Sequence, residues 1–229
     1  MNNPLISIIV PTYDEIENID SCLDHLVNTM RNRRQNFEVV GVDSGSRDGT
    51  LEIWQSYANN NPEVQLIQQK RREGMGSALK EAYAKCRGDY ICHYECDQSF
   101  PVEIYLEVLT KLSNSADFIL GVRLGNREGL LRNIYSAGYR FFIRTLFGIN
   151  YHSINFSFKV FKRKILESFN LVSNRWFIDA ELVIQTHRHD YIIEEYPVQH
   201  LARTKGRSKV RILDAIDIVS EGLQFYRNH

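Results

Sequence analysis

The sequence predicts an α/β fold in which a mostly parallel central sheet is flanked by helices on both faces. Through the first half of the chain, short β-rich runs alternate with segments whose apolar residues recur at helical spacing. The opening run, residues 5–10, is continuously apolar, which is typical of a strand buried on both faces. Because an intervening helix returns the chain to the starting edge of a sheet, this alternation favours parallel pairing.

Each element of the first half has its own local pattern. Strands are predicted at residues 5–10, Phe37–Asp43, Val64–Gln68 and 90–95. Helices are predicted over residues 16–30, 48–57 and 75–86, and Pro101 begins a further one. Gly88 ends the third of these helices.

The second half is less regular. Strands are predicted at residues 118–123, 156–161 and 192–198, and helices at Leu130–Phe147, 179–187 and 212–226. A basic loop spans residues 203–211. Since no linker or repeat interrupts the chain, we expect one domain over residues 1–211. Residues 212–229 would then form an amphipathic helix packed on that domain or on a membrane surface.

Composition excludes several classes of protein. Lys plus Arg and Asp plus Glu both total 28, so no overall positive field favours nucleic acid. The four cysteines form no CxxC pair, and residues 1–11 lack a signal-peptide pattern. No apolar stretch is long enough for a membrane span. These features predict a cytoplasmic protein with reduced thiols packed in its core; a membrane contact would be at the cytoplasmic face.

Polar residues follow three of the predicted strands. Residues 11–15 (PTYDE) come after the first strand, residues 43–50 (DSGSRDGT) end the second, and residues 95–97 (ECD) end the fourth. Ligands of open α/β sheets bind at the carboxyl ends of the strands. The three segments therefore predict a single site at one edge of the sheet.

Glu95 and Asp97 carry the most chemical signal within that site. On an extended segment, residues two apart point to the same side, so both carboxylates would converge. Hard oxygen ligands beside a phosphate suit Mg²⁺ or Mn²⁺. The alternative is a pair of solvated acids at a strand end.

Five motifs occur in order along the chain: VPTYDEIENI (10–19), VDSGSRDGT (42–50), REGMGSALKEAYAKCRGDY (72–90), ECDQSFPVE (95–103) and RTKGRSK (203–209). Together they resemble the family 2 glycosyltransferases, specifically the dolichyl- or polyprenyl-phosphate mannose or glucose synthase branch. The resemblance covers about residues 4–211. It implies the GT-A fold, a Rossmann-like single domain that binds nucleotide diphosphate sugars.

The resemblance assigns roles to individual residues. Asp97, with Glu95, would hold the metal ion. The residues implied to contact the nucleotide sugar are Pro11, Thr12, Tyr13, Glu15, Asp43, Ser44, Glu95, Cys96 and Asp97. Three positions depart from the family pattern: Glu95 replaces Asp, Ser44 replaces a second acid that reads the base, and Ser99 replaces Gln. The choice between guanine and uracil is therefore open.

The resemblance also assigns the basic loop. Arg203, Ser208 and Lys209 match residues that close over the donor and bind its phosphates, where cations stabilise the charge of the leaving group. The alternative is a solvated basic stretch or a lipid-surface patch. Arg123 matches a position that faces the acceptor phosphate, although a lone arginine is more often a surface residue.

Asp179 and Glu181 match an acidic helix start. An alcohol acceptor needs a general base, which either residue could provide, whereas a lipid phosphate is already ionised. The alternative is that both acids cap the helix N-terminus. Gly74 and Gly76 allow a similar choice between a phosphate cradle and ordinary turn geometry.

The sequence thus predicts a hexosyltransferase that uses Mg²⁺ or Mn²⁺ and works with inversion. Its donor would be a nucleotide diphosphate sugar of the GDP-mannose or UDP-glucose type, and its acceptor a lipid phosphate such as dolichyl or polyprenyl phosphate. The segment Leu130–Phe147 mixes aromatic side chains with arginines, which suits peripheral membrane contact or a core helix. The alternatives are a soluble acceptor, a nucleotidyltransferase, or a degenerate member that binds nucleotide without catalysis.

Overall fold

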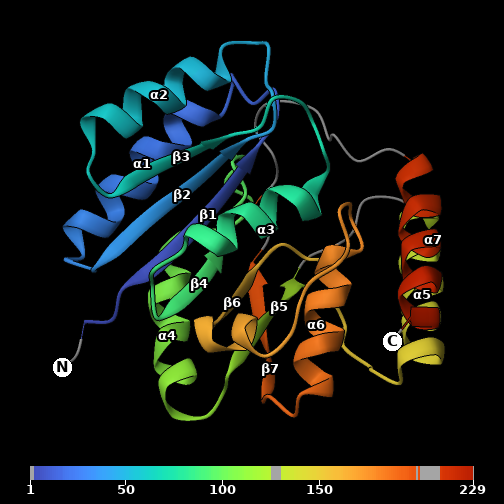
Figure 1. The fold of residues 1–229 in the computed structure, drawn as a ribbon. Helices are drawn as coiled ribbons and strands as arrows, with labels where there is room; N and C mark the ends of the chain where they lie inside the picture. Colours follow the sequence, from blue (N-terminus) through green and yellow to red (C-terminus); the bar gives the residue numbers. More distant parts are fainter. Residues whose placement is uncertain (1–2, 125–129, 200, 202–211, 229) are drawn as a thin grey trace.

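The computed structural model describes residues 3–124, 130–199, 201 and 212–228, and these contain one seven-stranded sheet (Figure 1). The strands are β1 (Ile6–Thr12), β2 (Phe37–Asp43), β3 (Val64–Gln68), β4 (Tyr90–His93), β5 (Phe118–Leu124), β6 (Lys159–Lys162) and β7 (Ile193–Gln199). Their order across the sheet is β3-β2-β1-β4-β6-β5-β7.

Only β6 runs against the other strands of this sheet. It pairs antiparallel with both β4 and β5, whereas the pairs β1–β2, β1–β4, β2–β3 and β5–β7 are parallel. The other six strands therefore end at the same edge, which we call the carboxyl edge. The mostly parallel sheet predicted from the sequence is confirmed.

Helices cover both faces of the sheet (Figure 1). They are α1 (Ile19–Asn32), α2 (Thr50–Asn60), α3 (Met75–Lys85), α4 (Ile104–Asn114), α5 (Leu130–Phe147), α6 (Ile178–Arg188) and α7 (Ile212–Asn228), with a short 3₁₀ helix at Arg163–Glu167. One core cluster joins α1, α2 and α4 to the sheet, and a second joins α3, α5, α6 and α7 to the opposite face.

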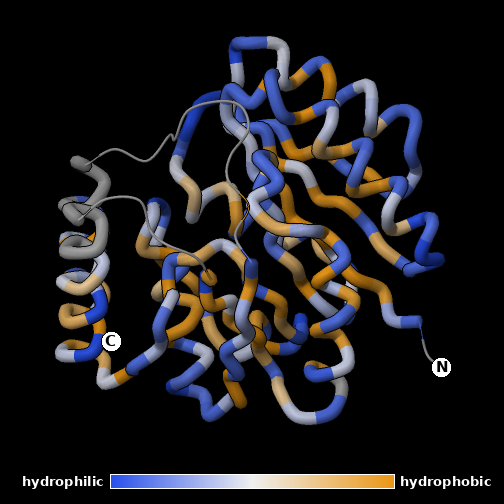
Figure 2. The backbone as a smooth tube through the Cα atoms, turned by 180° about the vertical axis from the view of Figure 1, so that it is seen from behind, coloured by the Kyte–Doolittle hydropathy of each residue, from blue (hydrophilic) through white to orange (hydrophobic). Residues whose placement is uncertain are grey.

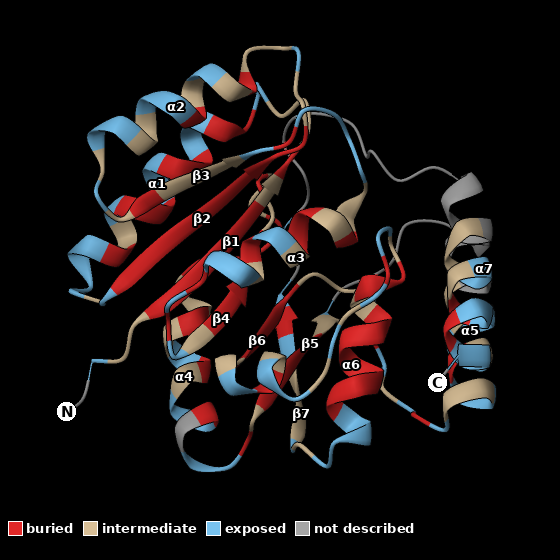
Figure 3. Cartoon of the chain, in the orientation of Figure 1, coloured by how far each residue is buried: buried red, intermediate tan, exposed pale blue. Residues whose placement is uncertain are grey.

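Burial follows this layering. The central strands β1 and β2 are almost entirely buried, as a strand covered on both faces must be (Figure 3). Seen from behind, the hydrophobic positions follow the strands and the hydrophilic ones lie on the outer helices (Figure 2). All four cysteines are buried, which confirms their expected place in the core.

Several predicted boundaries are wrong by two or three residues. The first strand continues through Pro11 to Thr12, because β2 pairs with it along its whole length. The strand predicted at 156–161 begins only at Lys159. The strand predicted at 90–95 ends at His93, where its pairing with β1 ends; its pairing with β6 ends at Cys92.

The described part of α7 packs against the main body of the chain. Phe225 is buried and its ring lies against those of Phe147 in α5 and Phe177 just before α6. The predicted division at residue 211 lies outside the described residues. Among the residues that the structure describes, no helix combines the length and apolar character needed to cross a membrane.

Candidate active site

The loops after β1 and β2 are bonded to each other at the carboxyl edge. The Ser44 amide donates to the Thr12 carbonyl at 2.9 Å, and the Asp14 amide donates to Ser46 Oγ at 2.9 Å. In return, the Arg47 amide donates to Asp14 Oδ1 at 2.9 Å. Asp14 has a φ of 50°, an uncommon conformation for a non-glycine residue, so these bonds hold a locally strained backbone. The two predicted polar segments thus form one rigid wall.

Tyr13 and Glu15 lie in this wall. The Arg72 guanidinium stacks 4.6 Å from the centre of the Tyr13 ring, a cation–π contact between the ends of β1 and β3. Glu15 Oε2 accepts a hydrogen bond from Asn18 at 2.8 Å, and its amide donates to Thr50 Oγ1 at 2.8 Å. No sequence signal distinguished Arg72 from its basic neighbours, because the stacking depends on the folded loop.

Asp43 is a buried carboxylate with one bonded oxygen. Its Oδ2 accepts the amides of Gly45 and Ser46 at 3.1 and 3.0 Å. Its Oδ1 is buried and has no hydrogen-bond partner among the described residues. Because an unmade hydrogen bond at a buried carboxylate is costly, Oδ1 is an acceptor suited to a ligand N–H or O–H.

Glu95 and Asp97 lie in a turn rather than on the strand. The Gln98 amide donates to the Glu95 carbonyl at 3.0 Å, and Gln98 has a φ of 54°. The prediction that strand alternation aims both carboxylates to one side is therefore wrong, because the extended segment has already ended. The turn still places both half-buried acids directly after β4, at the carboxyl edge.

Ser99 supports Asp97. Its hydroxyl donates to Asp97 Oδ1 at 2.5 Å, and its own side chain is buried. The residue that departs from the family pattern here thus orients the acid beside it. The amide of Leu201, immediately before the basic loop, donates to the Ser99 carbonyl at 2.7 Å. The chain that leads into the basic loop is therefore tied to the Asp97 turn.

Two residues predicted to contact the nucleotide sugar turn their side chains inward. Thr12 Oγ1 donates to the Val42 carbonyl and accepts from Trp54 Nε1 at 2.9 Å. Cys96 is buried beside Cys22, and a hydrogen bond between the two thiols together with burial raises the pKa of Cys96. As these side chains are placed, both residues present only backbone groups to a ligand.

Gly74 and Gly76 serve backbone packing. The amides of Gly76 and Ser77 donate to the carbonyls of Arg175 and Asn174 at 3.2 and 3.1 Å. A Cβ on Gly74 would lie 2.3 Å from the Asn174 carbonyl oxygen. Two of the amides at the start of α3 are thus already bonded. A Cβ on Gly76 would lie 2.4 Å from the Ser173 carbonyl oxygen, so close backbone packing, together with the positive φ of Gly74, accounts for both glycines.

The acids at the start of α6 have separate environments. Glu181 is fully buried, and its two oxygens accept the amides of Val172 and Ser173 at 2.6 and 2.8 Å. Asp179 pairs with the ammonium of Lys159 at 2.6 Å. The capping alternative holds only in part: both acids lie in the first turn of α6, where negative charge is favourable, but α6 has no side-chain cap hydrogen bond. Glu181 holds the loop before the helix, and Asp179 keeps a partly exposed carboxylate.

Lys159 is the buried charge that the sequence interpretation missed. A signal was present, since a lysine between Phe158 and Val160 interrupts an apolar strand pattern. Arg123 lies near the end of β5 and is partly buried. Arg203, Ser208 and Lys209 lie outside the described residues.

The described residues contain no group of three or more acidic, histidine or cysteine side chains that could enclose a metal ion. Glu95 and Asp97 are two hard oxygen donors in one turn, which would suit Mg²⁺ or Mn²⁺ only if substrate oxygens and water completed the coordination.

The sequence profile of glycosyl transferase family 2 matches residues 7–169, which include both carboxyl-edge loops and the Asp97 turn. The chain belongs to glycosyl transferase family 2. Glycosyltransferase AglD of Haloferax volcanii is 25% identical over 97% of this chain, which spans only 36% of that relative. Dolichyl-phosphate beta-glucosyltransferase ALG5C of Trichomonas vaginalis is 26% identical, with 96% of this chain and 71% of the relative covered.

Solved structures agree with the family fold. Glucosyl-3-phosphoglycerate synthase from Mycobacterium tuberculosis, in complex with Mn²⁺, UDP and glucosyl-3-phosphoglycerate, has a TM-score of 0.70 at 18% identity. The match covers 97% of this chain and 78% of that one. The mannosyltransferase PcManGT from Pyrobaculum calidifontis, in complex with GDP-Man and Mn²⁺, has a TM-score of 0.62 at 20% identity and covers 91% and 59%. The family 2 chain described here has the expected GT-A fold.

Proposed function

We propose that this family 2 chain transfers a hexose from a nucleotide diphosphate sugar to a polyprenyl or dolichyl phosphate, with inversion. The observation that carries the proposal is the carboxyl edge itself. There a buried Asp43 with an unbonded oxygen ends β2, and the acidic turn at Glu95 and Asp97 follows β4, on the other side of β1. Relatives named dolichyl-phosphate beta-glucosyltransferase support the same class of reaction.

The donor would bind with its base near Asp43 and Tyr13. The free Oδ1 of Asp43 is an acceptor, which matches the ring N–H that both uracil and guanine carry. Burial strengthens such a bond, because no water competes for the oxygen. Ser44 adds no second charge at this position, so the geometry supports nucleotide binding without choosing the base.

The diphosphate would lie beside the Asp97 turn. Glu95 and Asp97 would hold Mg²⁺ or Mn²⁺, which when bound neutralises charge on the diphosphate. Ser99 keeps Asp97 oriented through its 2.5 Å hydrogen bond. Solved structures of similar fold that contain Mn²⁺ with UDP, or Mn²⁺ with GDP-Man, support the use of a divalent ion.

The basic loop would close over the same diphosphate. Leu201 is bonded to the Ser99 carbonyl, so the chain enters residues 202–211 next to the acidic turn. Arg203, Ser208 and Lys209 would then bind the phosphates and stabilise the charge that develops as the sugar leaves. The acceptor oxygen would attack the anomeric carbon from the opposite face.

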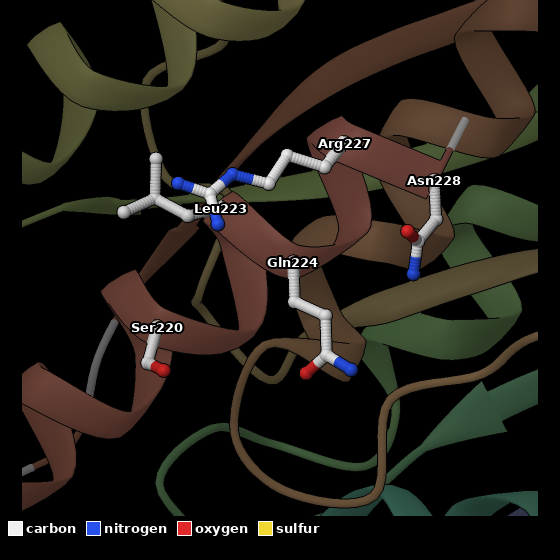
Figure 4. A pocket seen from close by; sticks show the side chains of 5 residues that line it. All are labelled: Ser220, Leu223, Gln224, Arg227 and Asn228. Carbon is white, nitrogen blue, oxygen red and sulfur yellow. The ribbon is translucent and has the colours of Figure 1, made fainter.

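The acceptor side is supported by an exposed apolar surface on α5 and α7, which lie side by side (Figure 1). Phe141 of α5 is 72% exposed, and Val219, Leu223 and Tyr226 form an exposed stripe along α7. Exposed Arg140, Arg144 and Arg227 accompany them. Figure 4 shows Leu223 and Arg227 close together on the outer face of α7. Aromatic and cationic side chains on helix faces suit peripheral contact with an anionic lipid surface.

The deciding experiment is calorimetric titration of the purified protein with GDP and UDP, each with and without Mn²⁺. We expect one nucleotide to bind, and only with the ion. Transfer to a short-chain polyprenyl phosphate is then measured with the matching nucleotide sugar. Absence of binding by both nucleotides would instead favour the degenerate, non-catalytic alternative.

Asp97→Asn tests the site assignment. The substitution removes one charge from the proposed ion ligands, and we expect metal-dependent nucleotide affinity to fall at least about 10-fold with an unchanged melting temperature. Glu52→Gln is the matched control, because Glu52 is an exposed acid on α2. Unchanged binding in Asp97→Asn would contradict the assignment.

A further inference from the structure

Lys159 is a charged side chain in the core. It is completely buried, and its ammonium lies 2.6 Å from Asp179 Oδ1 and 2.6 Å from the Phe156 carbonyl oxygen. A buried ammonium is unfavourable unless it is paired and hydrogen-bonded, and these two contacts meet both conditions. The lysine is therefore held in one position by the main chain on one side and by Asp179 on the other.

Stability alone does not explain this pair. Replacing a buried ion pair with apolar residues of similar size is often neutral or stabilising, so a fold has little reason to keep one for stability. Lys162, three positions along the same strand, shows the ordinary arrangement. It pairs with Asp117 at 3.0 Å, and its side chain is 27% exposed. Lys159 is thus fully buried at the first residue of β6, whereas Lys162 is partly exposed at the last residue of the same strand.

Lys159 lies at the carboxyl edge. Because β6 is antiparallel to its neighbours, its first residue lies toward the carboxyl edge, level with the end of β4 and opposite Leu120 of β5, which continues to Leu124. Cys92 pairs with Val160, so Lys159 is at the level of His93, two residues before Glu95. Helix α6 precedes β7 and runs back along the sheet, and therefore begins at this edge too (Figure 1).

Asp179 lies between the lysine and the surface. Its side chain is 14% exposed, whereas that of Lys159 is 0% exposed. The carboxylate is thus the accessible member of the pair, and the ammonium lies behind it. An oriented carboxylate facing outward at the carboxyl edge is what a transferase requires of an acceptor-side acid.

The groups around the pair come from four elements. Tyr83 of α3 and Tyr139 of α5 are close enough that the Asp179 charge, added to their burial, raises the pKa of each hydroxyl. His93 of β4 faces Lys159, and burial together with that ammonium lowers the pKa of His93. Glu181 has both oxygens occupied by loop amides. Among the described residues, Lys159 is the one cation that forms an ion pair with Asp179.

We propose that Lys159 is a positioning residue that holds the Asp179 carboxylate in place at the acceptor side of the site; this inference rests on the proposed transferase function. With an alcohol acceptor, the fixed carboxylate accepts the hydroxyl proton as the oxygen attacks. With a phosphate acceptor, the lysine offsets the carboxylate charge, so an anionic acceptor is not repelled from the edge.

The test compares Lys159→Met with Lys162→Met as the matched control. Each removes one ammonium from β6 that pairs with an aspartate, but only Lys159 lies at the carboxyl-edge end of the strand. For each variant, kcat and acceptor KM are measured with short-chain polyprenyl phosphate, donor affinity by calorimetry, and the melting temperature by circular dichroism. We expect Lys159→Met to lower kcat/KM for the acceptor about 100-fold with donor affinity unchanged, because the uncompensated Asp179 charge repels the anionic acceptor, and Lys162→Met to leave kcat/KM unchanged.

The double variant Lys159→Met with Asp179→Asn separates positioning from folding. Because the two residues act as a unit, we expect its kcat/KM for the acceptor to be no lower than that of Lys159→Met, and its melting temperature to be higher, since no unpaired charge remains buried. A Lys159→Met protein that melts lower but keeps its kcat/KM for the acceptor would overturn the inference, as would a parallel loss of donor affinity. Wild-type protein that binds donor but transfers nothing would overturn the proposed function, and this inference with it.

Discussion

The two edges of the central sheet each hold a buried carboxylate, but the two carboxylates differ in how completely they are hydrogen-bonded. At the amino edge, Glu38 is 1% exposed and fully bonded. It accepts the Ser7 hydroxyl at 2.6 Å, the Arg87 amide at 2.6 Å and the Arg87 guanidinium at 2.8 Å, and Gln65 adds a longer contact at 3.2 Å. These bonds join β1, β2, β3 and the turn after α3.

At the carboxyl edge, Asp43 is equally buried but only half bonded. One oxygen holds the loop amides and the other has no partner among the described residues. Burial of a carboxylate therefore does not by itself indicate a ligand-binding site. A carboxylate whose hydrogen bonds are complete stabilises the fold, and one that keeps an unbonded oxygen is available to a ligand.

The largest expected effect is at the amino edge. Glu38→Ala leaves the Ser7 hydroxyl and the Arg87 amide without their acceptor, and we expect the free energy of unfolding to fall by about 3 kcal/mol. Urea denaturation measures the loss, and nucleotide affinity of the folded fraction should not change. Glu38→Gln keeps the shape and should lose less. A change in nucleotide affinity with little loss of stability would show that Glu38 contributes to binding rather than to the fold.

Asp43→Asn should have the opposite pattern. The amide oxygen can still accept the two loop amides, so we expect the free energy of unfolding to stay within about 1 kcal/mol of wild type. The amide nitrogen would replace the free acceptor with a donor, and nucleotide affinity should fall roughly 10- to 100-fold. Calorimetry in the presence of Mn²⁺ measures the affinity. Wild-type affinity in this variant would mean that Oδ1 does not contact the base.

The smallest effect concerns pH and the wall beside the site. Burial alone would raise the pKa of Asp48, but hydrogen bonds from the Thr50 hydroxyl and from the amides of Ile16 and Thr50 outweigh it and hold that pKa below its usual value. Because the folded pKa is the lower one, this stabilisation is present above the unfolded pKa and is lost as pH falls through the folded value.

We expect that contribution to be about 0.5 kcal/mol, since Asp48 is partly exposed and its bonds compete with water. Melting temperatures of wild type and Asp48→Asn, measured between neutral pH and pH 3, test it. The difference between the two proteins should shrink as the pH falls. A difference that does not change with pH would show that the charge of Asp48 contributes nothing to the wall.

Local patterns predicted the elements better than their ends. Continuous apolar runs identified the strands, because a strand buried on both faces carries apolar residues at nearly every position. They did not reveal that β4 stops at His93, since that depends on how far β1 and β6 pair with it. The turn at residues 95–98 also depends on where strand pairing ends, so it could not be predicted. Glu95 and Asp97 themselves were apparent from the sequence.

By itself, the sequence determined the α/β class, the family, and the three polar segments that meet at the carboxyl edge, because these follow from hydrophobic periodicity and from ordered motifs. Which of the predicted site residues keep side-chain atoms available to a ligand depends on the tertiary structure. Glu181, Thr12 and Cys96 turn out to be occupied inside the fold, whereas Asp43 and Asp179 keep oxygens toward a ligand or the surface. The physical reason is that a hydrogen bond or ion pair needs a partner, and the partners of Thr12 and Asp179 come from other elements, Trp54 of α2 and Lys159 of β6.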